Sequence, residues 1–416
     1  MNYRPLVVLF LLLNPFWLQA LEPADPARFE KAIRAFEVED QAQTPPKGAT
    51  LFTGASNIRR WQSLPKRFEK SPVLNRGFGG SHLSDVVHFA DRIVTKYKPK
   101  QIYLNAGGND LHSGRTPQQV LAAFEAFVAK VQQDLPKTQL AFLSIPTSPS
   151  RWDEVELVKT TNSLISASCA KNGVDFIDIF PLLLGADGKP RPELYVEDKL
   201  HFSEAGYDVV TSAIKWQKEV FAFAKQDAKK APPSDPIVFT GSSSIREWDT
   251  LKEDFPGLPV LNRGFGGSVA NDLIVHVDTV VLRHEPKVLV TYTGSNDLTA
   301  NLTVQEAFED YTKFLDLVRE RSPKTRVVVT SVKIAIKHRR QIHEVHELNQ
   351  KLAEWAHDKN WVRYVDTTSY LADAKGQPIR DYYADDLIHL SPAGYVKWKE
   401  ILTPVLQEEW ARAHAA

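Results

Sequence analysis

The chain has 416 residues, enough for two domains of about 200 residues that each bury a core. Its 43% hydrophobic and 25% charged residues are typical of soluble globular proteins and exclude a disordered chain. Lys and Arg together number 51, as do Asp and Glu, so the charge balance predicts no nucleic-acid partner. Cys169 is the single cysteine, which excludes an intrachain disulfide.

The first 20 residues differ from the rest. Arg4 precedes an apolar run, PLVVLFLLL, and Leu18-Gln19-Ala20 has the small residue of a cleavage site. This layout predicts a secretory signal peptide over residues 1–20. The protein is therefore expected to be secreted or periplasmic, with no stable membrane insertion after cleavage. The alternative is an uncleaved anchor, although the run is short for a membrane span.

Two segments of the chain recur 187 residues later. FTGASNIRRW at 52–61 returns as FTGSSSIREW at 239–248, and LNRGFGGS at 74–81 returns unchanged at 261–268. Between the windows 52–81 and 239–268, 19 of the 30 positions are identical. The offset becomes 188 by Asp178 and Asp366. This recurrence predicts two domains that arose by duplication, residues 21–220 and 221–416.

Within each copy, short apolar segments alternate with longer amphipathic ones such as residues 116–135. The predicted strands are 49–54, 72–77, 101–107, 139–145 and 174–180 in the first copy, and 236–241, 259–264, 287–294, 325–332 and 362–367 in the second. Five strands alternating with helices predict an α/β fold, a doubly wound parallel sheet covered on both faces. A ligand site is then expected at the carboxyl ends of the strands.

A serine follows the first strand of each copy. Ser56 and Ser243 come directly after Phe-Thr-Gly-Ala and Phe-Thr-Gly-Ser and open the next helix. Such a serine can simply cap the helix. A helix N-terminus also directs backbone N–H groups at a developing anion, so the position permits nucleophilic catalysis.

Glycines and an asparagine follow the next two strands. The segments are Gly77-Phe78-Gly79-Gly80 and Gly107-Gly108-Asn109-Asp110, repeated as Gly264-Phe265-Gly266-Gly267 and Gly294-Ser295-Asn296-Asp297. Glycines and Asn-Asp are common in turns for conformational reasons alone. Alternatively, a glycine N–H and an asparagine amide can both stabilise an oxyanion.

The segments DKLHFSEAGY at 198–207 and DLIHLSPAGY at 386–395 precede the last helix of each copy. An Asp three residues before a His can orient the imidazole that accepts a proton from a serine. One Asp-x-x-His is weak evidence, but two, each following the same Ser, Gly and Asn segments, indicate serine hydrolase chemistry.

Ser, Gly, Asn and His in this order resemble the SGNH (GDSL-type) hydrolase family over both halves, and the closing motif is most similar to its platelet-activating-factor acetylhydrolase-like branch. The resemblance implies two flavodoxin-like three-layer α/β/α domains, no metal or organic cofactor, and ester hydrolysis through an acyl-enzyme. It implies the nucleophiles Ser56 and Ser243, the bases His201 and His389, the orienting Asp198 and Asp386, and the oxyanion donors Gly80, Asn109, Gly267 and Asn296.

The chain departs from the family's name motif, because Ala55 and Ser242 stand where Asp is usual before the serine. Ser81 and Ser268 likewise stand where Asp often follows the oxyanion glycine. These changes are expected to alter the hydrogen bonds of the oxyanion loop while leaving the triads complete. If one copy has lost activity, Ala55 and Asn57 point to the first.

Several other residues have two interpretations. Arg59, Arg76, Arg246 and Arg263 could contact an acidic or sugar substrate or form structural ion pairs. Trp61 and Trp248 are expected to be packing residues. His338, His343 and His346 are expected to lie on a solvated helix rather than to bind a metal.

The expected function is hydrolysis of small-acyl esters, with acetyl as the acyl group and a carbohydrate as the substrate. The alternatives are a lysophospholipase or thioesterase of the same family and a glycan-binding tandem module with vestigial sites. The expected partner is a small-molecule or glycan ester. The sequence does not predict the oligomeric state.

Overall fold

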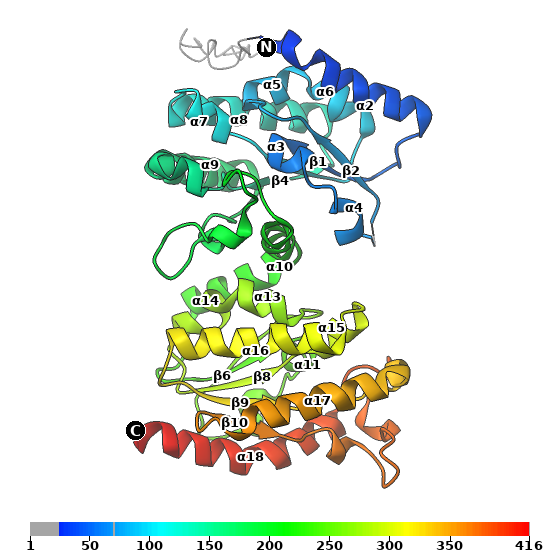
Figure 1. Ribbon diagram of the computed structural model, residues 1–416, viewed down its shortest axis with the longest axis vertical. Coiled ribbons are helices and arrows are strands. Elements are labelled where there is room, and N and C mark those ends of the chain that lie inside the picture. The colour runs from blue at the N-terminus through cyan, green and yellow to red at the C-terminus, as the bar shows by residue number, and fades with distance from the viewer. Residues whose placement is uncertain (1–24, 70, 416) are drawn as a thin grey trace, which may run out of the picture. The chain divides into compact units, whose positions relative to one another are not determined.

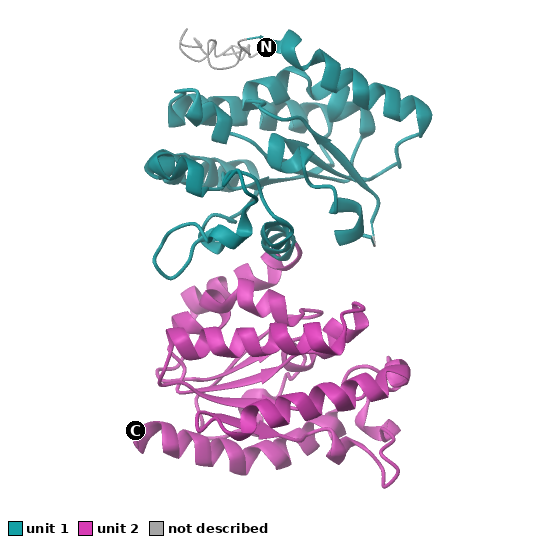
Figure 2. Ribbon diagram, in the orientation of Figure 1, with its two compact units in different colours: residues 1–214 teal, residues 215–416 magenta. Residues whose placement is uncertain are grey.

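The computed structural model describes residues 25–69 and 71–415 (Figure 1). The chain divides into two compact units, residues 1–214 and 215–416 (Figure 2). The division falls within helix α10 (Glu204–Lys229), which also contains the sequence-based boundary near residue 220. The predicted signal peptide lies outside the described residues. No helix among the described residues is long and apolar enough to cross a membrane.

Each unit contains a five-stranded sheet in which every strand pair is parallel, as predicted. The strands of unit 1 are β1 (Thr50–Gly54), β2 (Val73–Gly77), β3 (Gln101–Asn105), β4 (Gln139–Leu143) and β5 (Asp175–Ile177), in the order β2-β1-β3-β4-β5. Those of unit 2 are β6 (Ile237–Gly241), β7 (Val260–Gly264), β8 (Val288–Tyr292), β9 (Arg326–Thr330) and β10 (Val362–Val365), in the matching order β7-β6-β8-β9-β10. This strand order is that of a flavodoxin-like doubly wound sheet, and it confirms the predicted fold class.

Helices connect the strands in both units. Unit 1 contains α2 (Glu30–Ala42), α3 (Ser56–Arg59), α4 (Leu64–Arg67), α5 (Leu83–His88), α6 (Ala90–Ile93), α7 (Gly108–His112), α8 (Pro117–Asp134), α9 (Val155–Asn172) and the start of α10. Unit 2 contains the end of α10 and α11 (Ser243–Arg246), α12 (Leu251–Asp254), α13 (Ala270–Val275), α14 (Val277–Val280), α15 (Ser295–Thr299), α16 (Val304–Arg321), α17 (Ile342–His357) and α18 (Pro392–Ala415).

Both faces of each sheet are buried, which is why the strands read as nearly continuous apolar runs. In unit 2, one face packs on residues of α13, α16 and α17, and the other on residues of α11, α12 and α18. Trp61 and Trp248, 2% and 1% exposed, pack beneath the first strand of their units. Their expected packing role is confirmed.

Helix α10 contributes to both units. Near its start, Tyr207 stacks on Trp61 of unit 1 at a ring distance of 5.0 Å. Farther along, Phe223 packs under the guanidinium of Arg263 in unit 2. The same contact in unit 1 joins Phe36 of α2 to Arg76, 187 residues earlier. The second half of α10 is therefore the repeat of α2.

Candidate active site

The turn after the first strand requires glycine. Gly54 and Gly241 have φ angles of +132° and +136°. A Cβ atom would lie 2.0 Å from the carbonyl oxygen of Asn105 in the first case and 1.9 Å from that of Tyr292 in the second. Only glycine fits such a conformation and such a close approach.

This turn places the serine in the first position of a four-residue helix. Ala55 and Ser242 occupy the N-cap positions, and neither makes a side-chain cap hydrogen bond. Ser56 and Ser243 follow as the first helical residues, and each hydroxyl contacts a histidine ring instead of a backbone N–H group. The capping interpretation of these two serines is wrong.

In unit 1, Ser56, His201 and Asp198 form a hydrogen-bonded chain. The serine Oγ lies 2.9 Å from Nε2 of His201, and Nδ1 of the same ring lies 2.7 Å from Oδ2 of Asp198. With Nδ1–H donating to the carboxylate, Nε2 is left to accept the hydroxyl proton. The structure therefore brings together three residues that are up to 145 positions apart in the chain.

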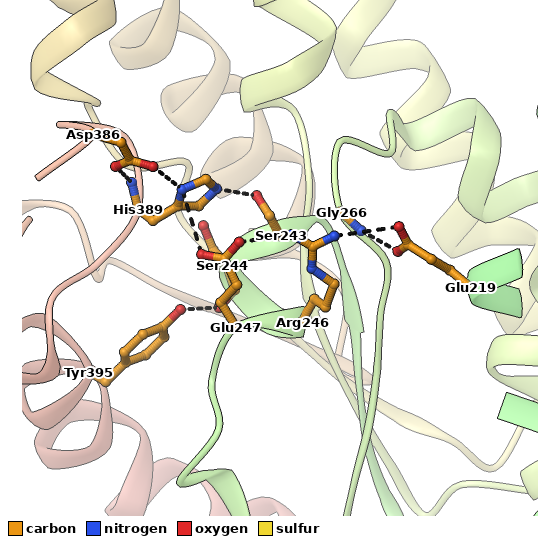
Figure 3. A network of polar contacts seen from close by, with 9 residues as sticks. All are labelled: Glu219, Ser243, Ser244, Arg246, Glu247, Gly266, Asp386, His389 and Tyr395. Carbon is orange, nitrogen blue, oxygen red and sulfur yellow. Dashed lines mark hydrogen bonds and ion pairs between the residues drawn. The ribbon is translucent and has the colours of Figure 1, made fainter. Parts of the chain in front are cut away.

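Unit 2 contains the same chain (Figure 3). Ser243 Oγ lies 2.7 Å from Nε2 of His389, and Nδ1 of His389 lies 2.5 Å from Oδ2 of Asp386. The side chain of His389 is 23% exposed and that of His201 is 15% exposed. Both imidazole rings are thus partly accessible to solvent.

The loop that carries Asp and His has a special backbone conformation. Lys199 and Leu387, which follow the two aspartates, have φ angles of 57° and 62°, a region that side chains rarely adopt. The turn lets the other carboxylate oxygen, Oδ1, accept two backbone N–H groups, from residues 200 and 201 in unit 1 and from 388 and 389 in unit 2. Both copies have this strained backbone conformation, and in both the carboxylate is directed towards the histidine ring.

These hydrogen bonds keep the carboxylates ionised. Burial by itself would raise the pKa of Asp386, but the N–H groups of His389 and Ile388 and the His389 ring lower it to about 2. Burial opposes ionisation of Asp198 as well, and the corresponding donors hold its pKa well below its usual range. An ionised carboxylate beside the ring stabilises the protonated imidazole.

The predicted oxyanion residues of each unit are tied to one another, and Asn109 shares a cavity with Ser56. Gly80 and Gly267 are exposed, with φ angles of +81°. Asn109 and Asn296 each donate one amide N–H to the carbonyl of the residue after that glycine, at 3.2 and 2.9 Å. Because an amide has two N–H groups, each asparagine keeps a second donor while being tied to the oxyanion loop.

Two buried aspartates follow the predicted oxyanion asparagines, and the sequence predicted no role for them beyond the turn. Asp110 accepts the backbone N–H of Leu83, and Asp297 accepts that of Ala270 at 2.9 Å. They connect the asparagine segment to the helix after the oxyanion loop. Burial raises the pKa of both carboxyls to about 7. The sequence signal that could have identified them is that an Asp follows the Asn at the same place in both copies.

A small cavity of about 60 Å³ opens beside Ser56 in unit 1. Its lining comprises Ala55, Ser56, Asn57, Asn105, Ala106, Gly108, Asn109, Pro146, Thr147, Ser148, Arg151, Glu154, Val158, Leu200 and His201. Ser56, His201 and Asn109 thus line one cavity.

Arg151 distinguishes the first site from the second. Its Nη1 donates to Oδ1 of Asn109 at 3.2 Å and to the carbonyl of Gly108 at 3.3 Å, which orients the amide of Asn109. At the offset of 187, His338 stands in its place in unit 2, and Lys333 replaces the cavity residue Pro146. The two copies therefore differ at two positions that line the cavity of unit 1.

The four arginines separate into two pairs. Arg76 and Arg263 have side chains only 6% and 3% exposed and form buried ion pairs with Asp40 and Asp227. These contacts support the interpretation of Arg76 and Arg263 as structural ion-pair residues. Arg59 and Arg246 are exposed and lie against the glycine loop, beside Gly79 and Gly266 respectively.

The departures from the name motif make the two oxyanion loops unequal. Ser268 Oγ donates to the carbonyl of Gly241 at 3.3 Å. The hydroxyl of Ser81 is buried and has no hydrogen-bond partner among the described residues. At this position the oxyanion loop of unit 1 therefore has one hydrogen bond fewer than that of unit 2.

The histidines of the second unit do not form a metal-binding cluster. His343 and His346 lie exposed on α17, and His338 lies in the turn before it. Within residues 25–69 and 71–415, no group of three His, Cys, Asp or Glu side chains could hold a metal ion.

Solved structures with a similar chain trace each match about half of this chain. A structure described as a platelet activating factor from Streptococcus pneumonia has 20% sequence identity and a TM-score of 0.42, covering 49% of this chain and 99% of that one. A GDSL-like lipase from Bacteroides thetaiotaomicron has 19% identity and a TM-score of 0.40, covering 45% and 97%. An acetylxylan esterase from Geobacillus stearothermophilus has 14% identity and a TM-score of 0.35, covering 40% and 93%.

A comparison with curated proteins finds no match. A comparison with models of protein families, in contrast, matches both units. The model of the GDSL-like lipase/acylhydrolase family matches twice, over residues 47–209 and 234–397, which is most of the chain. The chain belongs to the GDSL-like lipase/acylhydrolase (SGNH) family and is a serine hydrolase that acts on ester bonds.

Proposed function

We propose that the protein is a secreted or periplasmic esterase that removes small acyl groups, above all acetyl, from carbohydrate esters. The two proposed catalytic sets are Ser56, His201, Asp198, Gly80 and Asn109 in unit 1, and Ser243, His389, Asp386, Gly267 and Asn296 in unit 2. The observation that carries this proposal is the hydrogen-bonded Ser–His–Asp chain at the same sheet edge of both units.

In the first half of the reaction, Nε2 of the histidine takes the serine proton while Oγ attacks the ester carbonyl carbon. The carbonyl oxygen becomes an oxyanion, which the glycine N–H, the free amide N–H of the asparagine and the serine N–H stabilise. The intermediate then expels the alcohol, which takes the proton from Nε2. An acyl-enzyme on the serine remains.

In the second half, a water molecule attacks the acyl carbon, and the same histidine accepts its proton. A second oxyanion forms at the same donors and collapses to release the carboxylic acid, while the proton returns from Nε2 to Oγ. The carboxylate of Asp198 or Asp386 stays ionised throughout and stabilises the imidazolium in both halves.

The size and lining of the first site support a small acyl group. The cavity of about 60 Å³ beside Ser56 is far smaller than the pockets of about 300–1,000 Å³ that hold drug-sized ligands. Asn57, Thr147, Ser148 and Arg151 at its walls offer hydrogen bonds to hydroxyl groups of a sugar. A long acyl chain would exceed this volume.

Labelling with a fluorophosphonate probe tests the two nucleophiles. The variants Ser56→Ala and Ser243→Ala should each keep one labelled domain, and the double variant should neither label nor hydrolyse p-nitrophenyl acetate. Wild-type hydrolysis by the double variant would overturn the assignment. A glycan-binding module with vestigial sites would leave the wild-type protein unlabelled.

The acyl group is tested with p-nitrophenyl esters from C2 to C12. The proposal expects kcat/KM to be highest at C2 and to fall steeply with chain length. An optimum between C8 and C12 would instead support the lysophospholipase or thioesterase alternative. The location is tested by sequencing the N-terminus of the exported protein, which is expected to begin after Ala20.

A further inference from the structure

Lys333 is a buried lysine that follows the carboxyl end of β9 in unit 2. Its side chain and backbone together are only 2% exposed. The ammonium lies 5.5 Å from the centroid of the Tyr292 ring, and no described residue accepts a hydrogen bond from it or forms an ion pair with it. Lysine is rarely buried without a partner, because an unpaired charge in the interior is unfavourable. Unit 2 thus holds a buried cation whose N–H groups have no acceptor among the described residues.

The neighbours of Lys333 connect it to the catalytic set of unit 2. The backbone carbonyl of Tyr292, whose ring the ammonium contacts, accepts the N–H of Ser242, the residue before the nucleophile, at 3.1 Å. Farther along the segment of Lys333, the N–H of Lys337 donates to the carbonyl of Leu387 at 3.1 Å. Leu387 lies in the loop that carries the Asp and His of the triad. The lysine is therefore attached on one side to the serine turn and on the other to the loop of the base.

The repeat places Lys333 at the same part of the site. At the offset of 187, Lys333 corresponds to Pro146 and Tyr292 to Asn105, and both of these unit 1 residues line the cavity beside Ser56. In the proposed reaction, the small acyl group occupies that cavity. The ammonium of Lys333 therefore belongs to the part of the second site that faces the acyl group.

The charged residues of the first cavity are not repeated in unit 2. Arg151 and Glu154 line the first cavity together, a cation with a carboxylate, and Arg151 donates to Asn109 at 3.2 Å. Their counterparts at the offset of 187 are His338 and Gln341. The lysine is the one Lys, Arg, Asp or Glu among the unit 2 residues that correspond to the lining of the first cavity.

The carboxylates beside the base of unit 2 have other partners. Asp386 is hydrogen-bonded to His389, and Glu247 accepts a hydrogen bond of 2.8 Å from Arg246 (Figure 3). Neither carboxylate forms an ion pair with Lys333 in the described part of the chain. The charge of the lysine is thus available to a ligand.

Two buried hydroxyls at the end of β8 also lack a partner. Tyr292 and Thr293 are 0% exposed, and neither the phenol oxygen of the first nor Oγ1 of the second has a hydrogen-bond partner among the described residues. In unit 1, Asn105 stands in place of the tyrosine and donates its amide to the carbonyls of Leu143 and Ser144 at 3.1 and 3.3 Å. Because a buried donor without an acceptor is unfavourable, these hydroxyls independently support a ligand rich in acceptors in unit 2.

We propose that Lys333 is the specificity residue of the second site and binds a carboxylate at the far end of the acyl group, so that this site hydrolyses esters of short dicarboxylic acids such as malonate and succinate. This inference rests on the proposed triad of unit 2 and adds the acyl class that its second site takes. A carboxylate offers about four acceptor positions, enough for the ammonium and a neighbouring hydroxyl. A hydrogen bond between an ammonium and a carboxylate is also stronger than one between neutral groups.

The experiment uses the full chain with Ser56→Ala, so that the second site alone is measured. The substrates are ethyl hydrogen malonate and ethyl hydrogen succinate, each paired with its uncharged amide, ethyl malonamate or ethyl succinamate, which has nearly the same shape. Release of ethanol at neutral pH gives kcat/KM, and the readout is the ratio of the acid to its amide. Lys333→Met removes the charge and keeps the length of the side chain. Lys337→Met, at an exposed lysine of the same segment, controls for net charge.

The larger of the two ratios should exceed one in the Ser56→Ala protein and fall about 10–100-fold in Lys333→Met, as the loss of a hydrogen bond to a charged group predicts. Lys337→Met should leave it unchanged. Because each ratio is measured within one protein, a partial loss of folded enzyme does not alter it.

Ratios below one for both acids, or ratios that Lys333→Met leaves unchanged, would overturn the inference while the triad of unit 2 stands. A protein that is labelled by the fluorophosphonate probe but cleaves neither acid ester would overturn it as well. A Ser56→Ala protein that is not labelled would instead remove the triad of unit 2, and this inference with it.

Discussion

The phenol of Tyr207 donates a hydrogen bond of 2.9 Å to the backbone carbonyl of Asn57, the residue after Ser56. Tyr395 does the same to Ser244, the residue after Ser243, at 3.0 Å (Figure 3). Burial raises the pKa of both phenols, so they stay protonated donors at any pH at which an esterase works. The closing Gly-Tyr of each Asp-x-x-His motif thus holds the serine turn from the last helix.

Replacing either tyrosine by phenylalanine should therefore slow the site that it supports. In the Ser243→Ala background, we expect Tyr207→Phe to lower kcat about 3–10-fold, with KM nearly unchanged, because the loss of one hydrogen bond costs roughly 1 kcal/mol. Tyr395→Phe should act likewise in the Ser56→Ala background. Tyr370→Phe, at a side chain 57% exposed, is the control. An unchanged kcat in both backgrounds would show that the bond does not position the serine.

Asp110 and Asp297 should make the stability of the fold depend on pH. Burial raises the pKa of each to about 7, above its value of about 3.9 in an unfolded chain. The folded state therefore holds these protons more tightly, and their contribution to stability is complete below pH 4 and is lost as the pH rises to about 7.

Between pH 5 and pH 8, each aspartate should reduce the free energy of unfolding by about 2–3 kcal/mol. In Asp110→Asn and Asp297→Asn this loss should disappear, since an amide can still accept the backbone N–H but does not ionise. Urea unfolding at the two pH values measures the difference. Asp175→Asn, at an exposed carboxylate, should behave as wild type. A pH dependence that survives both Asn variants would contradict the assignment.

Glu219 should support the oxyanion loop of the second site alone. Its Oε2 accepts the backbone N–H of Gly266, which precedes the oxyanion glycine Gly267, at 2.9 Å. In the Ser56→Ala background, Glu219→Ala is expected to lower kcat about 2–10-fold, as the loss of one hydrogen bond predicts. Glu219→Gln should keep most of the activity because its amide oxygen can still accept the N–H. A loss that is equal in the Ser243→Ala background would point to general unfolding instead.

Replacing Arg151 should lower the activity of the first site alone. Because its guanidinium holds Oδ1 of Asn109, Arg151→Ala frees the amide to rotate away from the oxyanion. We expect kcat for p-nitrophenyl acetate in the Ser243→Ala background to fall about 10-fold. His338→Ala in the Ser56→Ala background is the matched control, with little change expected. Equal effects at the two positions would show that the arginine has no special role.

The recurrence of short segments was enough to predict the fold and the principal residues of both sites. All ten predicted strands form, because each is an apolar run ended by glycine or a polar turn. The hydrogen-bonded chains follow from the order of Ser and Asp-x-x-His and from the rule that strand ends meet at one sheet edge. None of this required knowledge of side-chain contacts.

What the sequence could not predict depends on long-range contacts. In the sequence, Asp110 is typical of a turn residue. Its structural role follows only from its burial and from the hydrogen bond that it accepts from Leu83 N–H. The sequence is compatible with two interpretations of Arg76 and Arg263, because only their ion pairs with Asp40 and Asp227 indicate a structural role. Arg60 and Glu247 stand at the same place in the two copies, but the sequence does not predict that Arg60 contacts Asp198 whereas Glu247 contacts His389.

Helix α10 sets a limit on how the duplicated chain can be divided. Its first half carries Tyr207, which holds the serine turn of unit 1, and its second half carries Glu219 and Asp227, which support unit 2. A single cut between residues 214 and 215 would leave the second fragment with an exposed helix end next to Trp216. Fragments meant to fold alone must therefore overlap, with the whole of residues 204–229 present in each. The end of one repeat and the beginning of the next are therefore encoded within one continuous helix.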